Sequence, residues 1–122
     1  MSLEKQVISF LEEFEGNVSD VISTSIVKSD GFSLFNTGKK EFDSKKYAAM
    51  SAGLFGLSNR TMVAIEGGNL IHTYVKGEKT ELIIIAIPEK KLFVSVVTKK
   101  DPNIGLILYQ LDGLVKRLKE VF

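Results

Sequence analysis

Apolar side chains near the start of the chain recur at the spacing of an amphipathic helix. They stand four, three, one and three residues apart, at Leu3, Val7, Phe10, Leu11 and Phe14. This spacing places them on one face of a helix. Ser2 can cap the first turn and Gly16 can end the last one. We therefore predict a helix over residues 2–14.

The next segment has the pattern of a β-hairpin. Residues 21–27 are mostly β-branched, which strands favour. Residues 29–31, Ser-Asp-Gly, have the composition of a tight turn and lead into the apolar residues 32–35. We predict two paired strands joined by this turn.

Residues 61–76 alternate in a way that suits a long strand. Thr61, Val63 and Ile65 are β-branched and alternate with other apolar residues, and residues 70–76 again alternate between two faces. Gly67-Gly68 between the two stretches is typical of a bulge or a turn. We predict one interrupted strand over 61–76, followed by a turn at 77–79.

Two further strands and a helix complete the pattern. Residues 82–87 are apolar at every position, which predicts a strand covered on both faces. Residues 92–98 predict another strand, and Asp101 can cap a last helix with Pro102 at its first position. The apolar face of that helix comprises Ile104, Ile107, Leu108, Leu111, Val115 and Leu118.

The elements follow one another in the order α-β-β-α-β-β-β-α. Short turns join neighbouring strands, so the sheet should be antiparallel and about five-stranded. The strand at 82–87 needs cover on both faces, so helices should pack on both sides of the sheet. We predict the fold class α/β (α+β): a three-layer α-β-α sandwich formed by one domain over residues 1–122.

The middle helix, which we predict over residues 43–60 with Asp43 as its N-cap, is unusual because of its small residues. One face should pack on the sheet and comprises Tyr47, Met50, Leu54 and Leu57. The opposite strip is flat and comprises Ala48, Ala49, Ser51, Ala52, Gly53 and Gly56. No charged residue occurs from Ala48 to Asn59, although a solvated helix face normally carries several.

The glycines of this helix require an explanation. Each costs about 0.8 to 1 kcal/mol relative to alanine, so Gly53 and Gly56 need a compensating contact such as the close approach of another backbone. We interpret the strip as the helix interface of a homodimer. The alternative is that the strip packs inside the monomer. The helix residues of the predicted dimer interface are Ala48, Ala49, Ser51, Ala52, Gly53, Phe55, Gly56 and Asn59.

Composition narrows the function classes. The 122 residues suit one domain, and 16 basic against 15 acidic residues give a net charge of +1. This balance does not favour nucleic acid or an anionic membrane as the main partner. The chain has no cysteine, and its longest apolar run, residues 82–87, is too short to span a bilayer. With no signal-peptide pattern at the start, we expect a soluble, cytoplasmic protein without a membrane span.

Residues for catalysis or for binding a cofactor do not form a recognisable pattern. His72 is the only histidine and lies in an alternating strand, which is more typical of a surface or interface residue than of a base or metal ligand. Ser23, Thr24 and Ser25 occur without the pattern of a catalytic triad. The glycines of 53–56 lie in mid-helix and lack the Gly-Lys-Ser/Thr ending of a phosphate loop. We expect no enzyme, no cofactor and no metal.

Three local patterns resemble the roadblock/dynein light chain family. They are residues 26–32, Ile-Val-Lys-Ser-Asp-Gly-Phe, the alanine-rich and glycine-rich helix 48–57, and residues 101–106, Asp-Pro-Asn-Ile-Gly-Leu. The last is similar to the signature that opens the final helix of roadblock domains. The resemblance covers essentially the whole chain, and the order and spacing of the patterns carry it.

The resemblance implies a profilin-like sandwich that dimerises through its middle helices and its third strands. On this chain the third strand adds Leu70, His72 and Tyr74 to the predicted interface. The family also implies a non-catalytic regulator or scaffold of a small Ras-like GTPase, with GTPase-activating regulation among its activities. The alternatives are a structural adaptor without effect on GTP hydrolysis and a profilin-like or PAS-like domain that senses a small molecule. The expected partners are a second copy of the chain, a small Ras-like GTPase and, as an alternative to the second copy, another roadblock protein.

Overall fold

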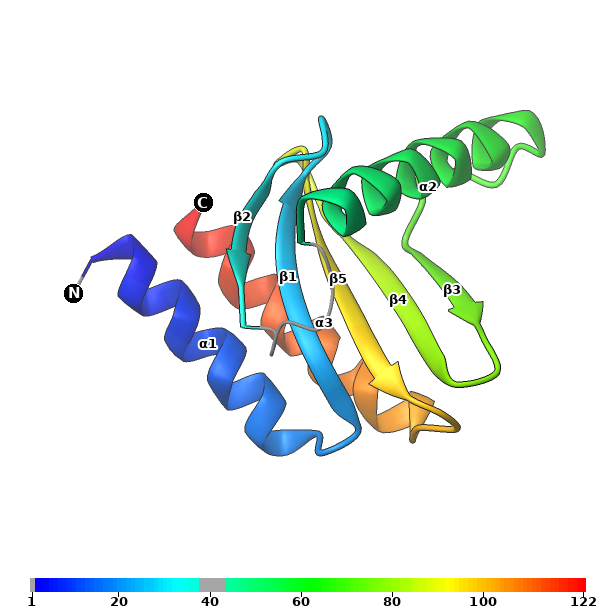
Figure 1. Ribbon diagram of the computed structural model, residues 1–122. Helices are drawn as coiled ribbons and strands as arrows, with labels where there is room; N and C mark the ends of the chain where they lie inside the picture. The colour runs from blue at the N-terminus through cyan, green and yellow to red at the C-terminus, as the bar shows by residue number, and fades with distance from the viewer. Residues whose placement is uncertain (1, 38–43) are drawn as a thin grey trace.

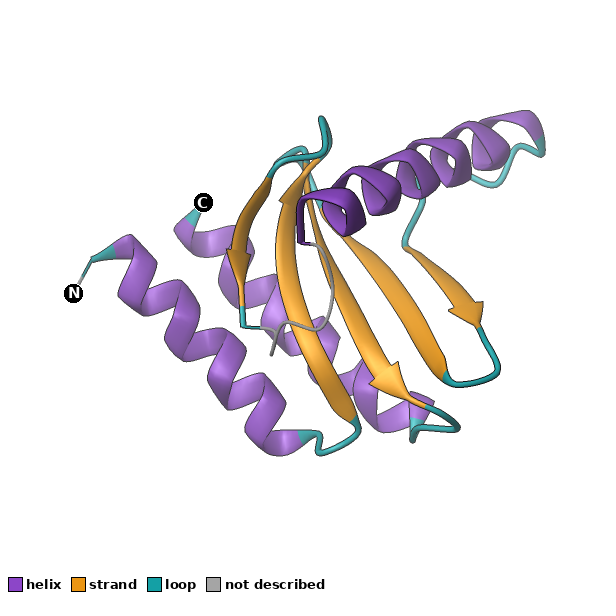
Figure 2. Cartoon of the chain, in the orientation of Figure 1, coloured by secondary structure: helices purple, strands orange, loops and turns teal. Residues whose placement is uncertain are grey.

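The computed structural model describes residues 2–37 and 44–122 of the chain (Figure 1). Its elements are α1 (Leu3–Asn17), β1 (Val21–Lys28), β2 (Ser33–Asn36), α2 (Ser44–Ala64), β3 (His72–Lys76), β4 (Thr80–Ile87), β5 (Leu92–Lys99) and α3 (Ile104–Val121). The predicted order of helices and strands is confirmed (Figure 2). The predicted cap of the middle helix, Asp43, lies outside the described residues.

The described strands form one antiparallel sheet in the order β2-β1-β5-β4-β3. Helices α1 and α3 lie side by side on one face, and α2 crosses the other face, so the predicted three-layer sandwich is confirmed (Figure 1). β5 is the central strand and pairs with β4 along its whole length, from Leu92↔Ile87 to Lys99↔Thr80. β2 and β3 form the two edges.

The described part of the chain has a hydrophobic cluster on each face of the sheet. The larger one lies between the sheet and the pair α1 and α3, where Leu11, Ile26 and Leu111 are fully buried. The smaller one lies beneath α2 and comprises Val27, Ala48, Ile84 and Phe93. Ile83, Ile85 and Ile87 belong to the larger cluster and Ile84 to the smaller one. Because successive strand residues face opposite sides, this explains why 82–87 is apolar throughout.

Helix α2 is longer than predicted and continues to Ala64. The β-branched residues 61–63 stay helical, and the Thr61 hydroxyl donates to the Leu57 carbonyl at 2.8 Å. The helix ends in a Schellman motif, in which the Gly67 amide donates to the Met62 carbonyl at 2.7 Å and the Glu66 amide to that of Val63 at 3.2 Å. Glu66 occupies the left-handed position with φ +55°. Glu66 and Gly67 are therefore the residues whose backbone terminates α2.

The prediction of one interrupted strand over 61–76 is wrong, because only β3, His72–Lys76, is a strand. Residues 61–64 belong to α2, and Gly67-Gly68 lie in the connection that follows. β3 pairs with β4 without a break, from His72↔Ile85 to Lys76↔Glu81. Alternation over five residues is too short to distinguish a strand from the last turn of a helix.

The start of α3 also differs from the prediction. The N-cap is Asn103, whose side chain accepts a hydrogen bond from the Leu106 amide at 3.1 Å, and the helix begins at Ile104. Asp101 instead lies in the turn before it, with φ +51°. The Ser2 cap of α1 is confirmed, since its hydroxyl accepts from the Lys5 amide at 3.2 Å. Among the described residues, no helix combines the length and hydropathy that crossing a membrane would require.

Candidate functional site

The face of α2 that contacts the sheet is the small-residue face in its first half. Ala48 and Ser51 are buried against the sheet of their own chain, and the Phe55 ring stacks on Phe93 with centroids 4.8 Å apart. Ala52 packs against the same cluster. Ala48 and Ser51 are therefore wrongly assigned to the dimer interface, because they are almost completely buried within one chain. Ala52 and Phe55 also direct their main contacts inward.

Small residues are needed here because α2 lies close to the β1–β2 turn and to a polar part of the sheet. Gly31 has φ +101°, and a side chain on it would approach the Ala49 Cα to 3.5 Å. The Tyr47 hydroxyl shares a hydrogen bond with the Ser95 hydroxyl, which lies 3.5 Å from that of Ser51. Burial raises the pKa of Tyr47, and the hydrogen bond to Ser95 partly offsets this. The intramolecular alternative therefore holds for this part of the strip.

The expectation that Met50 and Leu57 pack on the sheet is wrong. Met50 is 65% exposed and Leu57 54% exposed, whereas Tyr47 and Leu54 do face the sheet, partly buried. Met50 and Leu57 are seven residues apart and therefore share one side of the helix. Because successive residues are about 100° apart around the helix axis, this side lies opposite Ala48.

The other predicted interface residues are divided among different places. Ala49 and Gly53 point to solvent, and Gly56 is half-buried beside the Arg60 guanidinium. His72 and Tyr74 are exposed on β3. Asn59 and Leu70 line a cavity at the end of the sheet. A side chain added at Gly53 would meet no other part of the fold within 4 Å, so this glycine leaves a flat place on the outer side of α2.

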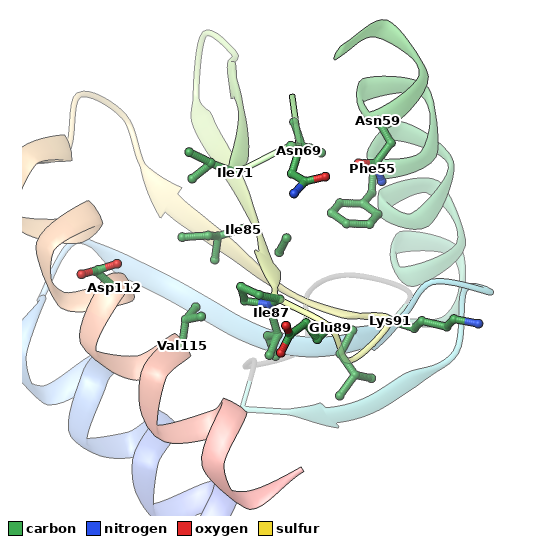
Figure 3. Close-up of a pocket in the computed structure, with 14 residues that line it drawn as sticks. Phe55, Asn59, Asn69, Ile71, Ile85, Ile87, Glu89, Lys91, Asp112 and Val115 are labelled. Carbon is green, nitrogen blue, oxygen red and sulfur yellow. The ribbon is translucent and has the colours of Figure 1, made fainter. Parts of the chain in front are cut away.

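Large apolar side chains are exposed on α2, in the connection that follows it and on β3. They are Met50, Leu57, Val63, Ile65 and Val75, and we call them together the α2–β3 surface. Ile71 is also exposed but lies on the Ile85 side of the sheet, away from α2 (Figure 3). Val63 is 78% exposed and Ile71 71% exposed. The second half of α2 projects past the sheet (Figure 1), so Val63 and Ile65 near its end have no layer to pack against. The spacing of Met50 and Leu57 did indicate one side of the predicted helix, but that side was assigned to the sheet. Val63 and Ile65 were assigned to a strand.

A groove of about 290 Å³ separates α2 from β3 within this surface. Its lining residues are Leu54, Leu57, Ser58, Thr61, Met62, Leu70, His72 and Thr73. The Thr73 hydroxyl donates to the Ser58 hydroxyl at 2.8 Å across the base and ties the helix to the strand. The groove is therefore a fixed concave feature with apolar walls.

The β3 edge is stabilised by a carboxylate from β4. Glu81 is 2% exposed and accepts hydrogen bonds from the Tyr74 hydroxyl and from the Asp101 amide, the latter at 3.0 Å. Lys76 pairs with Asp101 at 3.1 Å. The bond to Glu81 raises the pKa of Tyr74, and the bond to Asp101 raises the pKa of Lys76. Tyr74, through Glu81, and Lys76 are thereby connected to Asp101 in the turn between β5 and α3.

A cavity of about 590 Å³ lies where β4 continues past the start of β3 (Figure 3). The last contact between the two strands is the bond from the Ala86 amide to the Ile71 carbonyl, 3.1 Å long. Phe55 and Asn59 of α2 line the cavity from one side of the sheet, and Asp112 and Val115 of α3 from the other. The cavity therefore runs around the end of β4 and opens beside the α2–β3 surface.

The residues considered for catalysis do not converge. His72 is exposed on the edge strand, far in the sheet order from β1, which carries Ser23, Thr24 and Ser25. These three residues are buried, and the hydroxyls of Thr24 and Ser25 have no hydrogen-bond partner among the described residues. Within residues 2–37 and 44–122, no group of three His, Asp or Glu side chains could hold a metal ion.

Comparison with known proteins identifies the family. The model of the Roadblock/LC7 domain matches residues 9–97. A search of curated protein sequences finds no match. Myxococcus xanthus MglB is similar in structure, with a TM-score of 0.90 at 13% identity over 99% of this chain and 98% of that one.

Two further solved structures share the fold. A structure of MglB with a tetrameric arrangement has a TM-score of 0.88 at 13% identity over 97% of this chain and 88% of that one. Profilin IA of Acanthamoeba castellanii has a TM-score of 0.62 at 15% identity over 98% of both chains, so the expectation of a profilin-like sandwich is confirmed. Because the family model spans well over half of its length, the chain belongs to the Roadblock/LC7 domain family.

Proposed function

We propose that the chain is a non-catalytic regulator or scaffold of a small Ras-like GTPase and acts as a homodimer in the cytoplasm. Membership of the Roadblock/LC7 family supports the GTPase partner. The observation that carries the homodimer is the α2–β3 surface, where large apolar side chains remain exposed on a projecting helix and an adjacent strand. Contiguous exposed apolar surfaces on small domains usually mark interaction sites.

The two edges of the sheet differ in a way that supports pairing through β3. β3 has five residues in unbroken register with β4. β2 has four residues, and its register with β1 shifts between Ile26 and Val27. Short, bulged edges resist pairing with another strand, whereas regular edges permit it. Antiparallel pairing of two β3 strands would continue the sheet across a two-fold axis.

The same two-fold axis would bring the two α2 helices together. Leu57 lines the groove between α2 and β3, and the exposed Met50 lies on the same side of α2, seven residues earlier. A second copy would bury them there, and each copy would supply the same side chains to the other. Gly53 lies between them and would allow the backbones to approach closely. The composite outer face of the two helices is then the surface offered to the GTPase.

Light scattering coupled to size-exclusion chromatography tests the dimer. Leu57→Glu places a charge in the proposed interface and should convert the dimer to a monomer, with the far-ultraviolet circular dichroism unchanged. Leu34→Glu is a matched control, because Leu34 is exposed on the opposite edge of the sheet. A wild-type chain that is monomeric at about 100 μM, a concentration far above a micromolar dissociation constant, contradicts the homodimer.

The GTPase proposal is tested with the Ras-like GTPase encoded nearest to the gene for this chain. The expected result is co-purification and a changed rate of GTP hydrolysis, both lost in Leu57→Glu and kept in Leu34→Glu. Binding without a changed rate supports the scaffold form of the proposal. If the GTPase neither binds nor changes its rate while the chain is dimeric, the chain is a structural adaptor instead.

A further inference from the structure

The free edge of β3 presents a regular set of backbone groups. At the two ends of the strand, the Ile71 carbonyl and the Gly77 amide make hydrogen bonds to β4, of 3.1 and 3.0 Å. Because the backbone groups of successive strand residues point in alternate directions, residues 73 and 75 also bond to β4. The amides and carbonyls that point away from the sheet are therefore those of His72, Tyr74 and Lys76.

The side chains of these three residues share the face of the sheet on which α1 and α3 pack. His72 pairs with Ile85 and Tyr74 with Ile83 of β4, and both isoleucines belong to the larger hydrophobic cluster. Paired residues of neighbouring strands point to the same face of a sheet. Lys76 follows on this face because it lies two residues after Tyr74.

The outward backbone groups select one register for two antiparallel β3 strands, a step that rests on the homodimer proposed above. Two residues whose amides and carbonyls point at each other exchange two hydrogen bonds. With Tyr74 opposite Tyr74 of the partner subunit, all three outward residues are paired, whereas a shift by two residues leaves one unpaired in each copy. Val75, 42% exposed, then lies beside Thr73 of the partner subunit and becomes covered.

In this register His72 lies opposite Lys76 of the partner subunit, with Cα atoms about 5.5 Å apart. The ion pair with Asp101, 3.1 Å long, raises the pKa of Lys76, so the lysine stays charged at neutral pH. A histidine side chain ordinarily becomes protonated between about pH 8 and pH 5. Acid therefore places two positive charges opposite each other, which destabilises strand pairing.

The remaining charged groups on this face have partners of their own. Glu81 accepts hydrogen bonds from the Tyr74 hydroxyl and the Asp101 amide, and Asp112 of α3 pairs with Lys116 at 3.5 Å. The α2 residues that line the groove together with His72 are uncharged. His72 is also the only histidine of the chain, so no other side chain ordinarily changes its charge over this pH range.

We infer that two copies join through β3 in this register and that acid weakens the pairing, because protonated His72 then faces Lys76 of the partner subunit. The contact occurs twice, once on each side of the two-fold axis. The composite surface proposed for the GTPase is thereby complete at neutral pH and weakened at pH 5.5. The pH response belongs to the interface itself and needs no further ligand.

The dissociation constant of the dimer, measured by sedimentation at pH 8 and pH 5.5, tests the pH response. It should be about ten-fold larger at pH 5.5, since each of the two like-charged contacts contributes about three-fold. His72→Gln and Lys76→Gln should each remove most of this difference. Lys76→Glu should reverse it, because protonated His72 then faces a carboxylate. An equal pH dependence in wild type and His72→Gln, with unchanged circular dichroism, would overturn the inference.

A pair of cysteines tests the register independently, since the chain has none of its own. His72→Cys combined with Lys76→Cys should give disulfide-linked dimers at pH 8 under mild oxidation, because Cα atoms about 5.5 Å apart suit a disulfide. His72→Cys alone should not, since its two copies lie roughly 14 Å apart along the strands. A dimer at pH 8 without this linkage would overturn the inference and leave the homodimer in place, whereas a monomer at pH 8 would overturn both.

Discussion

Asp20 connects three parts of the chain through one carboxylate. One oxygen accepts the Asn103 amide at 2.8 Å, and the other pairs with Lys99 at 3.1 Å. The bond from Asn103, followed by that from Lys99, lowers the pKa of Asp20 below 3.8. A carboxyl with a lowered folded-state pKa contributes stability that is present above its unfolded pKa and is lost as pH falls through the folded one.

The residue-scale prediction concerns acid stability. Asp20→Asn should lower the free energy of unfolding at neutral pH and should flatten its fall below about pH 3.8, the ordinary value of the carboxyl. Urea unfolding measured at several pH values in wild type and variant checks this. Asp30→Asn is a control, because Asp30 is exposed and pairs with Lys28 at 3.8 Å. Parallel pH profiles for wild type and Asp20→Asn would contradict the prediction.

Single residues also show where prediction from sequence stops. Ser2 is correctly predicted as a cap because it is the one capping residue next to the first apolar position. Before α3, both Asp101 and Asn103 could cap the helix. Asn103 does so because its amide is held by Asp20, which lies eighty-three positions away in the sequence. Local patterns contain no information on such a contact.

At the scale of the element, the sequence does not reveal which face of α2 contacts the sheet. Apolar and small residues both follow helical spacing, and either set can face a sheet. The small set faces it because Tyr47 of α2 hydrogen-bonds to Ser95 of β5, which brings Ala48 and Ser51 against the sheet. The larger side chains of Met50 and Leu57 are left outside. Hydropathy alone favours the opposite orientation.

A pair of substitutions checks the orientation of α2. Ala48→Lys should destabilise the fold by about 3 kcal/mol or more, because it buries an unpaired charge. Gly53→Lys should instead stabilise the helix of the monomer by several tenths of a kcal/mol, since lysine is the better helix former and the site is open. Urea unfolding at concentrations low enough to keep the chain monomeric separates these outcomes. Equal losses in both variants would contradict the observed orientation.

The end of α2 supplies a second prediction for this element. Glu66 has φ +55° at the position of the Schellman motif that favours glycine. Glu66→Gly should raise the free energy of unfolding by roughly 0.5 to 1 kcal/mol, because it removes the cost of the left-handed conformation. Glu78→Gly, in a turn where glutamate does not have positive φ, should be neutral or destabilising. Thermal unfolding of the two variants makes the comparison.

At the scale of the whole molecule, the layers and the strand order have different origins. The three layers could be predicted, because residues 82–87 need cover on both faces and three helices are available. The position of β5 at the centre could not, because β4 and β5 are both apolar and local patterns do not specify which strand β1 joins. The resemblance to roadblock domains implied a dimer through the middle helix and the third strand, and this dimer stays a prediction.

Two copies that bury the α2–β3 surface only against each other would unfold as one unit. If the α2–β3 surface is buried only in the dimer, unfolding produces two chains from one particle, so stability rises with protein concentration. Each ten-fold increase should add about 1.4 kcal/mol per dimer, which raises the unfolding temperature by about 3 to 5 °C. Leu57→Glu should abolish this dependence, whereas Leu34→Glu should retain it. A wild-type unfolding temperature independent of concentration, together with a monomer by light scattering, would leave the exposed side chains of α2 to a different partner.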